Sequence, residues 1–214
     1  MSEVLPVQVL VLAKEPVAGR VKTRLSPPLT PEQSAQVAAA ALADTLDAVR
    51  CTPVATRVLV VDGRVSAHGF ACVPQVDGDL DARLGAAFDD AAGRGLPALL
   101  VGMDTPQLTP GMLEHACRAL LEHPAVLGRA EDGGWWALGL QRPVGSLLRG
   151  VPTSRDDTGA LQAARLLDAG LAVHQLAVLR DVDTVQDALA VAALAPASRF
   201  AAVLAPMLDL TEAG

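Results

Sequence analysis

A cluster of basic residues near the amino terminus is the first feature whose residue types and spacing could do chemistry. Lys14, Arg20, Lys22 and Arg24 lie within 11 positions, are four of the 17 lysines and arginines of the chain, and are opposed only by Glu15. Arginine binds phosphate oxygens through paired N–H donors, and lysine binds them as a point charge. The cluster predicts a binding site for a phosphate or diphosphate group. The alternative is a solvated basic loop.

The sequence around this loop departs from the two familiar nucleotide-binding patterns. Lys22-Thr23 matches only the end of GxxxxGK[ST], since the upstream glycine is absent, and no GxGxxG pattern occurs. The loop is therefore neither a P-loop nor the fingerprint of an NAD enzyme. Gly19 within the loop and Gly102 further along the chain complete the predicted phosphate-binding set.

Acidic residues follow two predicted strands. Asp104 comes just after a short apolar run, and Asp181 and Asp183 come after a later one. In an extended chain, alternate residues share a face, so the last two carboxylates would lie together and repel each other unless a cation or a basic partner lies between them. Carboxylates are ligands of hard divalent cations that also bind phosphate oxygens. The alternatives are an Asx-type turn at Asp104 and helix capping by Asp183 or Thr184.

A glycine-rich turn, Glu131-Asp132-Gly133-Gly134, precedes two tryptophans. Paired glycines permit a positive φ and the close approach of a ligand, and the Asp132 carboxylate can accept hydrogen bonds from hydroxyl groups. The alternative is a tight turn between two strands, with both tryptophans packed in the core. The four histidines are isolated in sequence and receive no role.

The elements that must position these residues alternate between strand and helix. Apolar runs predict strands, and apolar stripes with Thr-Pro or Asp starts predict helices. The expected strands cover residues 7–13, 57–61, 97–101, 125–127, 135–140 and 171–179; the expected helices begin at residues 31, 80, 110, 159 and 185, and the last is interrupted near Pro196 and resumes to Leu210. This alternation predicts a three-layer α/β/α fold with a mainly parallel, Rossmann-like sheet. Ligands of such sheets bind at the carboxyl ends of the strands.

Length and composition limit the classes of protein that fit. The chain has 214 residues, 51% of them hydrophobic, and a formal net charge of −7. We expect a single domain over residues 1–214. The negative charge and the scarcity of aromatic residues disfavour nucleic-acid binding. No apolar run is long enough to span a membrane and no secretion signal is evident, so a cytoplasmic location is expected. Three widely spaced cysteines predict reduced, mostly buried thiols.

Taken in order, AKEPVAGRVKTRL, GMDTPQL, EDGGWWALGL and DVDT resemble motifs of a bacterial family with the glycosyltransferase-A fold, in the nucleotide-diphospho-sugar transferase superfamily. The likeness runs from about residue 7 to residue 193. The first and last motifs are also similar to those of guanylyl- and cytidylyltransferases, including the phospholactate guanylyltransferase and molybdenum-cofactor enzymes.

The resemblance implies a role for each cluster. Lys14, Arg20, Lys22 and Arg24 match the basic loop around the nucleotide phosphates. Asp104 matches the aspartate that binds Mg²⁺ or Mn²⁺, and Asp183 matches a second metal ligand. The turn from Asp132 through Gly133 to Gly134 matches the region that faces the sugar or acceptor. Two departures lie on the acceptor side: Arg129 stands in place of a proline, and residues 151–154 replace a segment that often contains tryptophan.

Three functions follow from this interpretation. The leading one is metal-dependent nucleotidyl transfer from a nucleoside triphosphate to a phosphorylated small molecule, with Lys22, Arg24 and Asp104 as the catalytic residues. The second is glycosyl transfer from a nucleotide sugar to a small-molecule acceptor. The third is a non-catalytic nucleotide-binding module. The nucleotide base, the acceptor and the oligomeric state are left open by the sequence.

Overall fold

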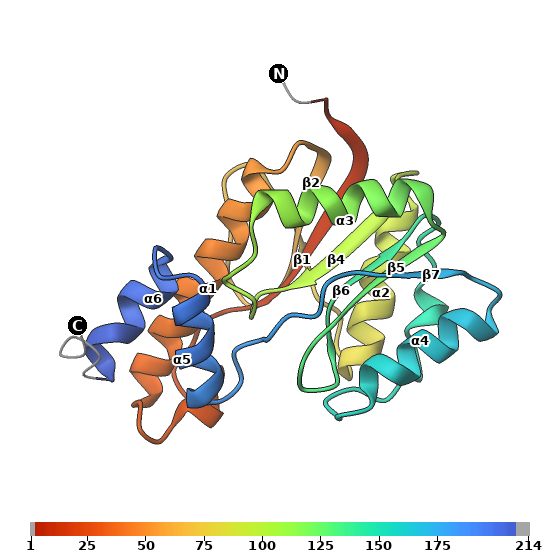
Figure 1. The fold of residues 1–214 in the computed structure, drawn as a ribbon. Coiled ribbons are helices and arrows are strands. Elements are labelled where there is room, and N and C mark those ends of the chain that lie inside the picture. Colours follow the sequence, from red (N-terminus) through yellow and green to blue (C-terminus); the bar gives the residue numbers. More distant parts are fainter. Residues whose placement is uncertain (1–2, 209–214) are drawn as a thin grey trace.

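A computed structural model describes residues 3–208 of the chain. Its centre is a seven-stranded sheet in the order β3-β2-β1-β4-β6-β5-β7 (Figure 1). The strands are β1 (Leu5–Lys14), β2 (Val54–Asp62), β3 (Ala71–Pro74), β4 (Ala98–Gly102), β5 (Ala125–Arg129), β6 (Trp135–Leu140) and β7 (Val173–Gln175). Only β6 runs antiparallel to its neighbours, β4 and β5, while the other pairings are parallel. The predicted mainly parallel sheet is confirmed.

Helices cover both faces of the sheet. They are α1 (Pro31–Cys51), α2 (Leu80–Ala92), α3 (Pro110–Glu122), α4 (Thr158–Asp168), α5 (Val185–Leu194) and α6 (Arg199–Leu204), with short 3₁₀ turns η1 (Thr23–Leu25), η2 (Gly145–Leu147) and η3 (Ala205–Met207). One buried cluster joins β1 to α1 and α3, and another joins the opposite face of the sheet to α2 and α4. This is the expected three-layer α/β/α arrangement.

The helix starts follow the predicted capping chemistry. The Thr30 hydroxyl accepts the N–H of Gln33, whose side chain accepts the N–H of Thr30 in return. Thr184 and Asp187 form the same reciprocal pair at α5. Thr109 caps α3, whereas Asp79 precedes α2 without a capping bond from its side chain. The threonine caps satisfy N–H groups that a helix leaves free in its first turn.

Two expectations about strands were wrong. The strand predicted over residues 171–179 is shorter in the structure, where β7 covers only Val173–Gln175. Leu179 pairs with Ala130 in an isolated bridge, so the ladder is interrupted between β7 and Leu179. At this break the carbonyl of Ala177 accepts the indole N–H of Trp136 instead. The edge strand β3 was not predicted, because its run of apolar residues is only four long, ends in a proline and is mostly exposed. The predicted break near Pro196 is confirmed, while Leu210 lies outside the described residues.

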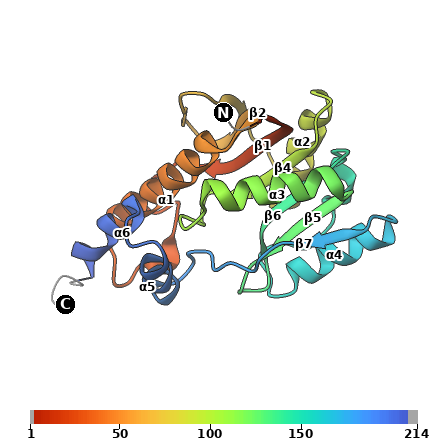
Figure 2. The same ribbon diagram turned by 45° about the horizontal axis from the view of Figure 1, so that its top comes forward.

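The carboxyl-terminal helices α5 and α6 lie beside α1, at the end of the molecule away from α4 (Figures 1 and 2). Their apolar residues form a third buried cluster with α1 and with Leu25 and Leu29 of the loop that follows the basic cluster. Leu25, which is the residue after Arg24, is fully buried there. The carboxyl-terminal helices therefore anchor the loop that carries the basic residues.

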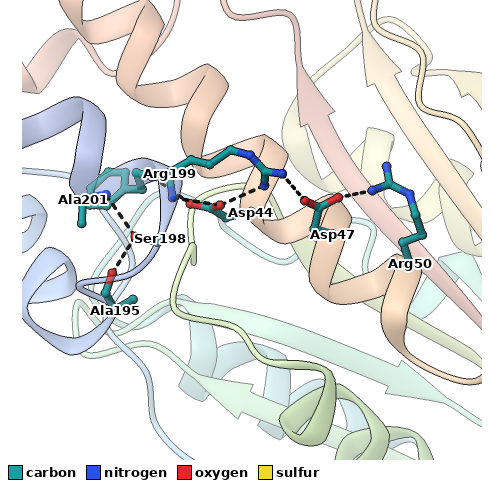
Figure 3. A network of polar contacts seen from close by, with 8 residues as sticks. Asp44, Asp47, Arg50, Ala195, Ser198, Arg199 and Ala201 are labelled. Carbon is teal, nitrogen blue, oxygen red and sulfur yellow. Dashed lines mark hydrogen bonds and ion pairs between the residues drawn. The ribbon is translucent and has the colours of Figure 1, made fainter.

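A polar network fixes α6 to α1 (Figure 3). The Asp44 carboxylate, only 11% exposed, accepts the backbone N–H of Phe200 at 2.8 Å and contacts the Arg199 guanidinium at 3.3 Å. Arg199 also pairs with Asp47 at 2.5 Å, and the hydrogen bond from Arg199 is the main cause that lowers the pKa of Asp47. The network combines capping of α6 with an ion pair across two helices.

We expect Arg199→Met to lower the free energy of unfolding by about 1 kcal/mol at neutral pH, because it leaves Asp44 and Asp47 with fewer partners. The folded-state pKa of Asp47 lies below its unfolded value of about 3.9. The contribution of the ionised Asp47 to the free energy of unfolding is therefore complete above the unfolded value, and it is lost as the pH falls through the folded-state pKa. Denaturant unfolding from about pH 7 to about pH 2 should show the difference from wild type shrinking with acid. Arg118→Met, which breaks an exposed pair within α3, is the control and should change stability less.

The prediction of mostly buried cysteines was wrong for two of the three. Cys51 and Cys72 are exposed, and only Cys117 is buried. Cys51 ends α1 and Cys72 lies in the edge strand β3, so neither faces the core. Burial raises the pKa of the Cys117 thiol to about 12.

Two thiols should therefore react quickly with an aromatic disulfide reagent in the native protein, because the thiolate is the reactive form and both groups are accessible. The third thiol, that of Cys117, should react only after unfolding. Cys117→Ser should remove the reaction that appears on unfolding and leave the two fast reactions unchanged. Rapid reaction of all three thiols in the native protein would contradict the packing of α3.

None of the helices within residues 3–208 is both long enough and apolar enough to cross a membrane.

Candidate active site

The predicted site residues meet at the edge of the sheet where the central parallel strands end. β1 ends at Lys14, which is in register with Asp62 at the end of β2, and Leu12 of β1 is in register with Gly102 at the end of β4. The basic loop leaves from β1, and Asp104 follows β4 by two residues. Their convergence follows directly from the parallel pairing of β1 with β4.

Lys22 forms the central contact between the two loops. Its Nζ lies 2.8 Å from Oδ1 of Asp104 and also donates to the carbonyl of Val182. The Lys22 side chain is only 8% exposed, whereas that of Asp104 is 41% exposed. Lys22 itself adopts a left-handed conformation with φ 49°. The basic loop is thus turned so that an ammonium group is enclosed against the loop that carries Asp104.

A second ion pair joins Arg24 to Asp183. Together with Lys14, Arg20, Lys22 and Asp104, these residues line a cavity of about 250 Å³. The predicted basic loop and both predicted metal-ligating aspartates therefore share one cavity. The Asp104 carboxylate contacts Lys22 and accepts no backbone N–H from the residues described, so the Asx-turn alternative does not account for it.

The segment that carries Asp183 is fixed to the loop that carries Asp104. The backbone N–H of Val182 donates to the carbonyl of Asp104 at 2.9 Å, and the Gln107 side chain donates to the carbonyl of Arg180. Val182 is fully buried, while Asp181 and Asp183 are half-buried on the opposite side. The predicted alternation is therefore present although no regular strand covers these residues. Thr184, not Asp183, caps α5.

A larger cavity of about 700 Å³ adjoins the first, and Lys14, Arg24, Asp104 and Asp183 line both. Gly102, Asp132 and Gly134 also line it, whereas Gly19 lines neither cavity.

Burial is the main cause that raises the pKa of Asp181 to about 6, and the nearby Asp132 carboxylate adds to the shift. Two of the three predicted acceptor residues, Asp132 and Gly134, thus share a cavity with Lys14 and Arg24 of the basic loop, whereas Gly133 lines neither cavity.

The glycine turn is the tight turn between two strands that the sequence offered as one alternative, and its role toward an acceptor stays a prediction. It connects the antiparallel strands β5 and β6, and Oδ1 of Asp132 accepts the N–H of Gly134 at 2.8 Å. Trp136 is buried and Trp135 is half-buried against the second core cluster, as the packing alternative expects, and both also line the larger cavity. Gly133 has φ +89°, and its carbonyl accepts the N–H of Gly159 at the start of α4. Gly133 therefore links the turn to the start of α4, next to residues 153–156 of the cavity wall.

Several lining residues escaped the sequence analysis. Arg83 of α2 pairs with Asp62 at 3.0 Å, and the Gln75 side chain donates to the carbonyls of Ala13 and Val60. Residues 153–156 form another part of the wall, with Ser154 at φ 60°. Asp62 comes directly after a predicted strand, and Asp104 comes shortly after another. This shared position was the signal that could have identified Asp62 as a lining residue.

The smaller cavity is lined by two carboxylates, those of Asp104 and Asp183, which are of the chemical type that binds magnesium or manganese. Mg²⁺ in nucleotide sites commonly binds one or two carboxylates and completes its coordination with phosphates and water. Asp104 and Asp183 supply such carboxylates. Within residues 3–208, no group of three or more acidic, histidine or cysteine side chains is arranged to hold a metal unaided. The donor set therefore suits a cation that arrives with a phosphate ligand.

Comparison with proteins of known sequence gives two matches. Phosphoenolpyruvate guanylyltransferase of Sanguibacter keddieii is 29% identical over 233 aligned positions, which cover 88% of this chain and 81% of that protein. A family model described as an uncharacterized protein conserved in bacteria, DUF2064, matches residues 34–155. The first match is a distant similarity to a nucleotidyltransferase.

Comparison with solved structures confirms the nucleotide-diphospho-sugar transferase fold. A structure assigned to a nucleotide-diphospho-sugar transferase from Desulfovibrio desulfuricans has a TM-score of 0.87 and 22% identity, over 96% of each chain. CMP:2-keto-3-deoxy-manno-octonic acid synthetase complexed with CTP has a TM-score of 0.60 at 14% identity, covering 92% of this chain and 99% of that one. A manganese complex of Rv0371c from Mycobacterium tuberculosis has a TM-score of 0.55 at 23% identity, covering 89% and 98%. With its family model matched over more than half of its length, the chain belongs to the DUF2064 family of bacterial proteins.

Proposed function

We propose that this chain, acting as one domain over residues 1–214, transfers a nucleotidyl group from a nucleoside triphosphate to a phosphorylated small molecule. The observation that carries the proposal is the shared cavity, in which Lys14, Arg20, Lys22 and Arg24 surround a space that Asp104 and Asp183 also line. The distant similarity to phosphoenolpyruvate guanylyltransferase supports the same reaction class.

In the proposed reaction, a phosphate oxygen of the acceptor attacks the α-phosphorus of the triphosphate. The bond from the α-phosphorus to the bridging oxygen of the β-phosphate breaks, and pyrophosphate leaves with the bonding electrons. Lys22 and Arg24 stabilise the negative charge of the leaving group, and Lys14 and Arg20 bind its phosphates. An acceptor phosphate is already ionised at neutral pH, so no general base is needed. Preorganised charge accounts for most of the catalysis in such transfers.

Asp104 and Asp183 are the residues that would hold Mg²⁺ or Mn²⁺. When bound, the cation would neutralise phosphate charge at the reacting centre. The manganese complex of the similar structure from Mycobacterium tuberculosis supports this choice of metal. Asp132 and Gly134 would face the acceptor, since they line the larger cavity beside the phosphate site.

Pyrophosphate release is the direct test. The protein is incubated with Mg²⁺, each of the four nucleoside triphosphates and a set of phosphorylated acids that begins with phosphoenolpyruvate. We expect pyrophosphate and a nucleotidylated acceptor in equal amounts for one combination. If a broad set of acceptors gives neither product while the folded protein binds the triphosphate, nucleotidyl transfer is ruled out.

Glycosyl transfer from a nucleotide sugar is the second candidate. It is favoured by the structural similarity to the nucleotide-diphospho-sugar transferase from Desulfovibrio desulfuricans. In that reaction Asp132 would position an acceptor hydroxyl, and the same basic residues would bind the diphosphate. Release of a nucleoside diphosphate from a nucleotide sugar, without pyrophosphate, distinguishes it from the leading proposal.

A further inference from the structure

We propose that Lys22 is a built-in counter-cation that blocks the metal site until a nucleotide binds. The inference rests on the proposed function for the identity of the site, and it adds an order of binding. Its basis is the position of the Lys22 ammonium, which contacts Oδ1 of Asp104 at 2.8 Å and the carbonyl oxygen of Val182. Both contacts are with oxygen atoms, the kind of donor that a hard divalent cation requires.

Enclosure makes this contact more than a surface ion pair. Only 8% of the Lys22 side chain is exposed. An exposed pair contributes little because water and salt screen it, whereas an enclosed ammonium retains most of its attraction to the carboxylate. The carbonyl of Val182 comes from a segment whose N–H donates to the carbonyl of Asp104. The two oxygen partners of Lys22 are therefore fixed relative to each other.

The charges of the smaller cavity lead to the same conclusion. Lys22 balances Asp104, and Arg24 balances Asp183. The two carboxylates that would bind a metal are thus each paired with a basic residue of one loop, Asp104 in an enclosed contact and Asp183 in a more exposed one. A divalent cation alone would have to displace an ammonium group and would meet its repulsion at close range. The cavity without nucleotide consequently has little net attraction for the cation.

A triphosphate changes this balance. Its oxygens offer Lys22 and Arg24 strong charge-assisted hydrogen bonds, which free the carboxylates of Asp104 and Asp183. The phosphates also supply further oxygen donors. Nucleotide binding should therefore raise the affinity for the metal, and the metal should raise the affinity for the nucleotide by the same factor.

The test measures Mn²⁺ binding to the full chain in the absence of nucleotide, from the loss of the electron paramagnetic resonance signal of free Mn²⁺. We expect Lys22→Met to bind Mn²⁺ at least about tenfold more tightly than wild type, because the repulsive cation next to Asp104 is removed. Lys14→Met is the matched control: Lys14 lines the same cavity but has no ion pair with another residue in the range 3–208. It should change the affinity by less than about threefold, since its charge is not in contact with a carboxylate.

Two further variants strengthen the test. Lys22→Met combined with Asp104→Asn should lose the gained affinity, which would locate the new metal site at Asp104. Lys22→Gln removes the charge but keeps a side-chain N–H donor, so it replaces Lys22→Met if circular dichroism shows that Lys22→Met is unfolded. Equal Mn²⁺ affinity of wild type and the Lys22 variants, or an equal gain in Lys14→Met, would overturn the proposal.

The outcome is separate from that of the proposed function. If GTP, CTP, ATP and UTP all fail to bind to the wild-type protein, the nucleotidyl-transfer proposal fails, while the nucleotide-free comparison still decides the role of Lys22. If a triphosphate binds, it should raise the Mn²⁺ affinity of wild type more than that of Lys22→Met. An equal rise in both proteins would contradict the counter-cation role.

Discussion

Replacing Asp104 by asparagine should lower the rate of pyrophosphate release by about 100-fold or more, the usual effect of losing one preorganised electrostatic contact at a phosphoryl centre. Asp104 lines both cavities and has two proposed roles. Its carboxylate is a proposed metal ligand, and it also contacts the Lys22 ammonium at 2.8 Å. Asparagine keeps the shape and the hydrogen-bonding oxygen but removes the charge, so the loss would report electrostatics.

The rate is measured as pyrophosphate release at saturating nucleotide and Mg²⁺. Asp90→Asn is the control, because Asp90 pairs with Arg94 on the exposed side of α2 and lines neither cavity. It should retain the wild-type rate. If Asp104→Asn also retained that rate while folding normally, the proposed metal site would be wrong.

Gly133→Ala should lower the free energy of unfolding by more than about 3 kcal/mol, since it combines backbone strain with a steric clash. At φ +89° an alanine is already strained, and its Cβ would lie 1.7 Å from the carbonyl oxygen of Asp156. The clash is with backbone, which cannot rotate away as a side chain can. The variant must therefore displace residues 153–158, which form one wall of the larger cavity.

Gly95→Ala is the matched control for this effect. Gly95 has φ +69°, but a Cβ there would have no neighbouring atom within 4 Å. It should cost only about 1 kcal/mol, the price of the left-handed conformation. Chemical denaturation of the two variants separates strain from clash. Equal losses of stability would show that the turn and the start of α4 are not packed together as described.

The location of the site could be predicted because it depends on local rules. Apolar runs identified β1 and β4, and the parallel pairing of these strands brings Lys14 and Gly102 to one edge of the sheet. The threonine caps identified where α1 and α3 begin. The position of Asp104 two residues after β4 was enough to place it near the basic loop.

The internal arrangement of the site depends on tertiary contacts that the sequence does not encode locally. Nothing in the spacing of the basic loop indicates that Lys22 adopts φ 49° and becomes enclosed while Arg24 stays exposed. Leu25, which follows Arg24, is buried against α1 and the carboxyl-terminal helices, and this contact fixes the end of the basic loop. The Arg83–Asp62 pair likewise requires α2 to pack beside the end of β2.

Edge elements were the hardest to predict. Three of the four residues of β3 are exposed, and its strand pairs only with β2 among the described residues. Cys72 lies in this strand and is exposed, although free cysteines are usually buried.

Thermal unfolding with nucleotides and Mg²⁺ tests the central claim most directly, namely that the basic loop and Asp104 form one polyphosphate site. A triphosphate or nucleotide sugar at about 100 times its dissociation constant should stabilise the wild-type protein by about 2.7 kcal/mol. The stabilisation should be greater with Mg²⁺ than without it, and it should be reduced in Arg24→Gln and Asp104→Asn alike. No stabilisation by any nucleotide, or stabilisation that both substitutions leave undiminished, would contradict the account.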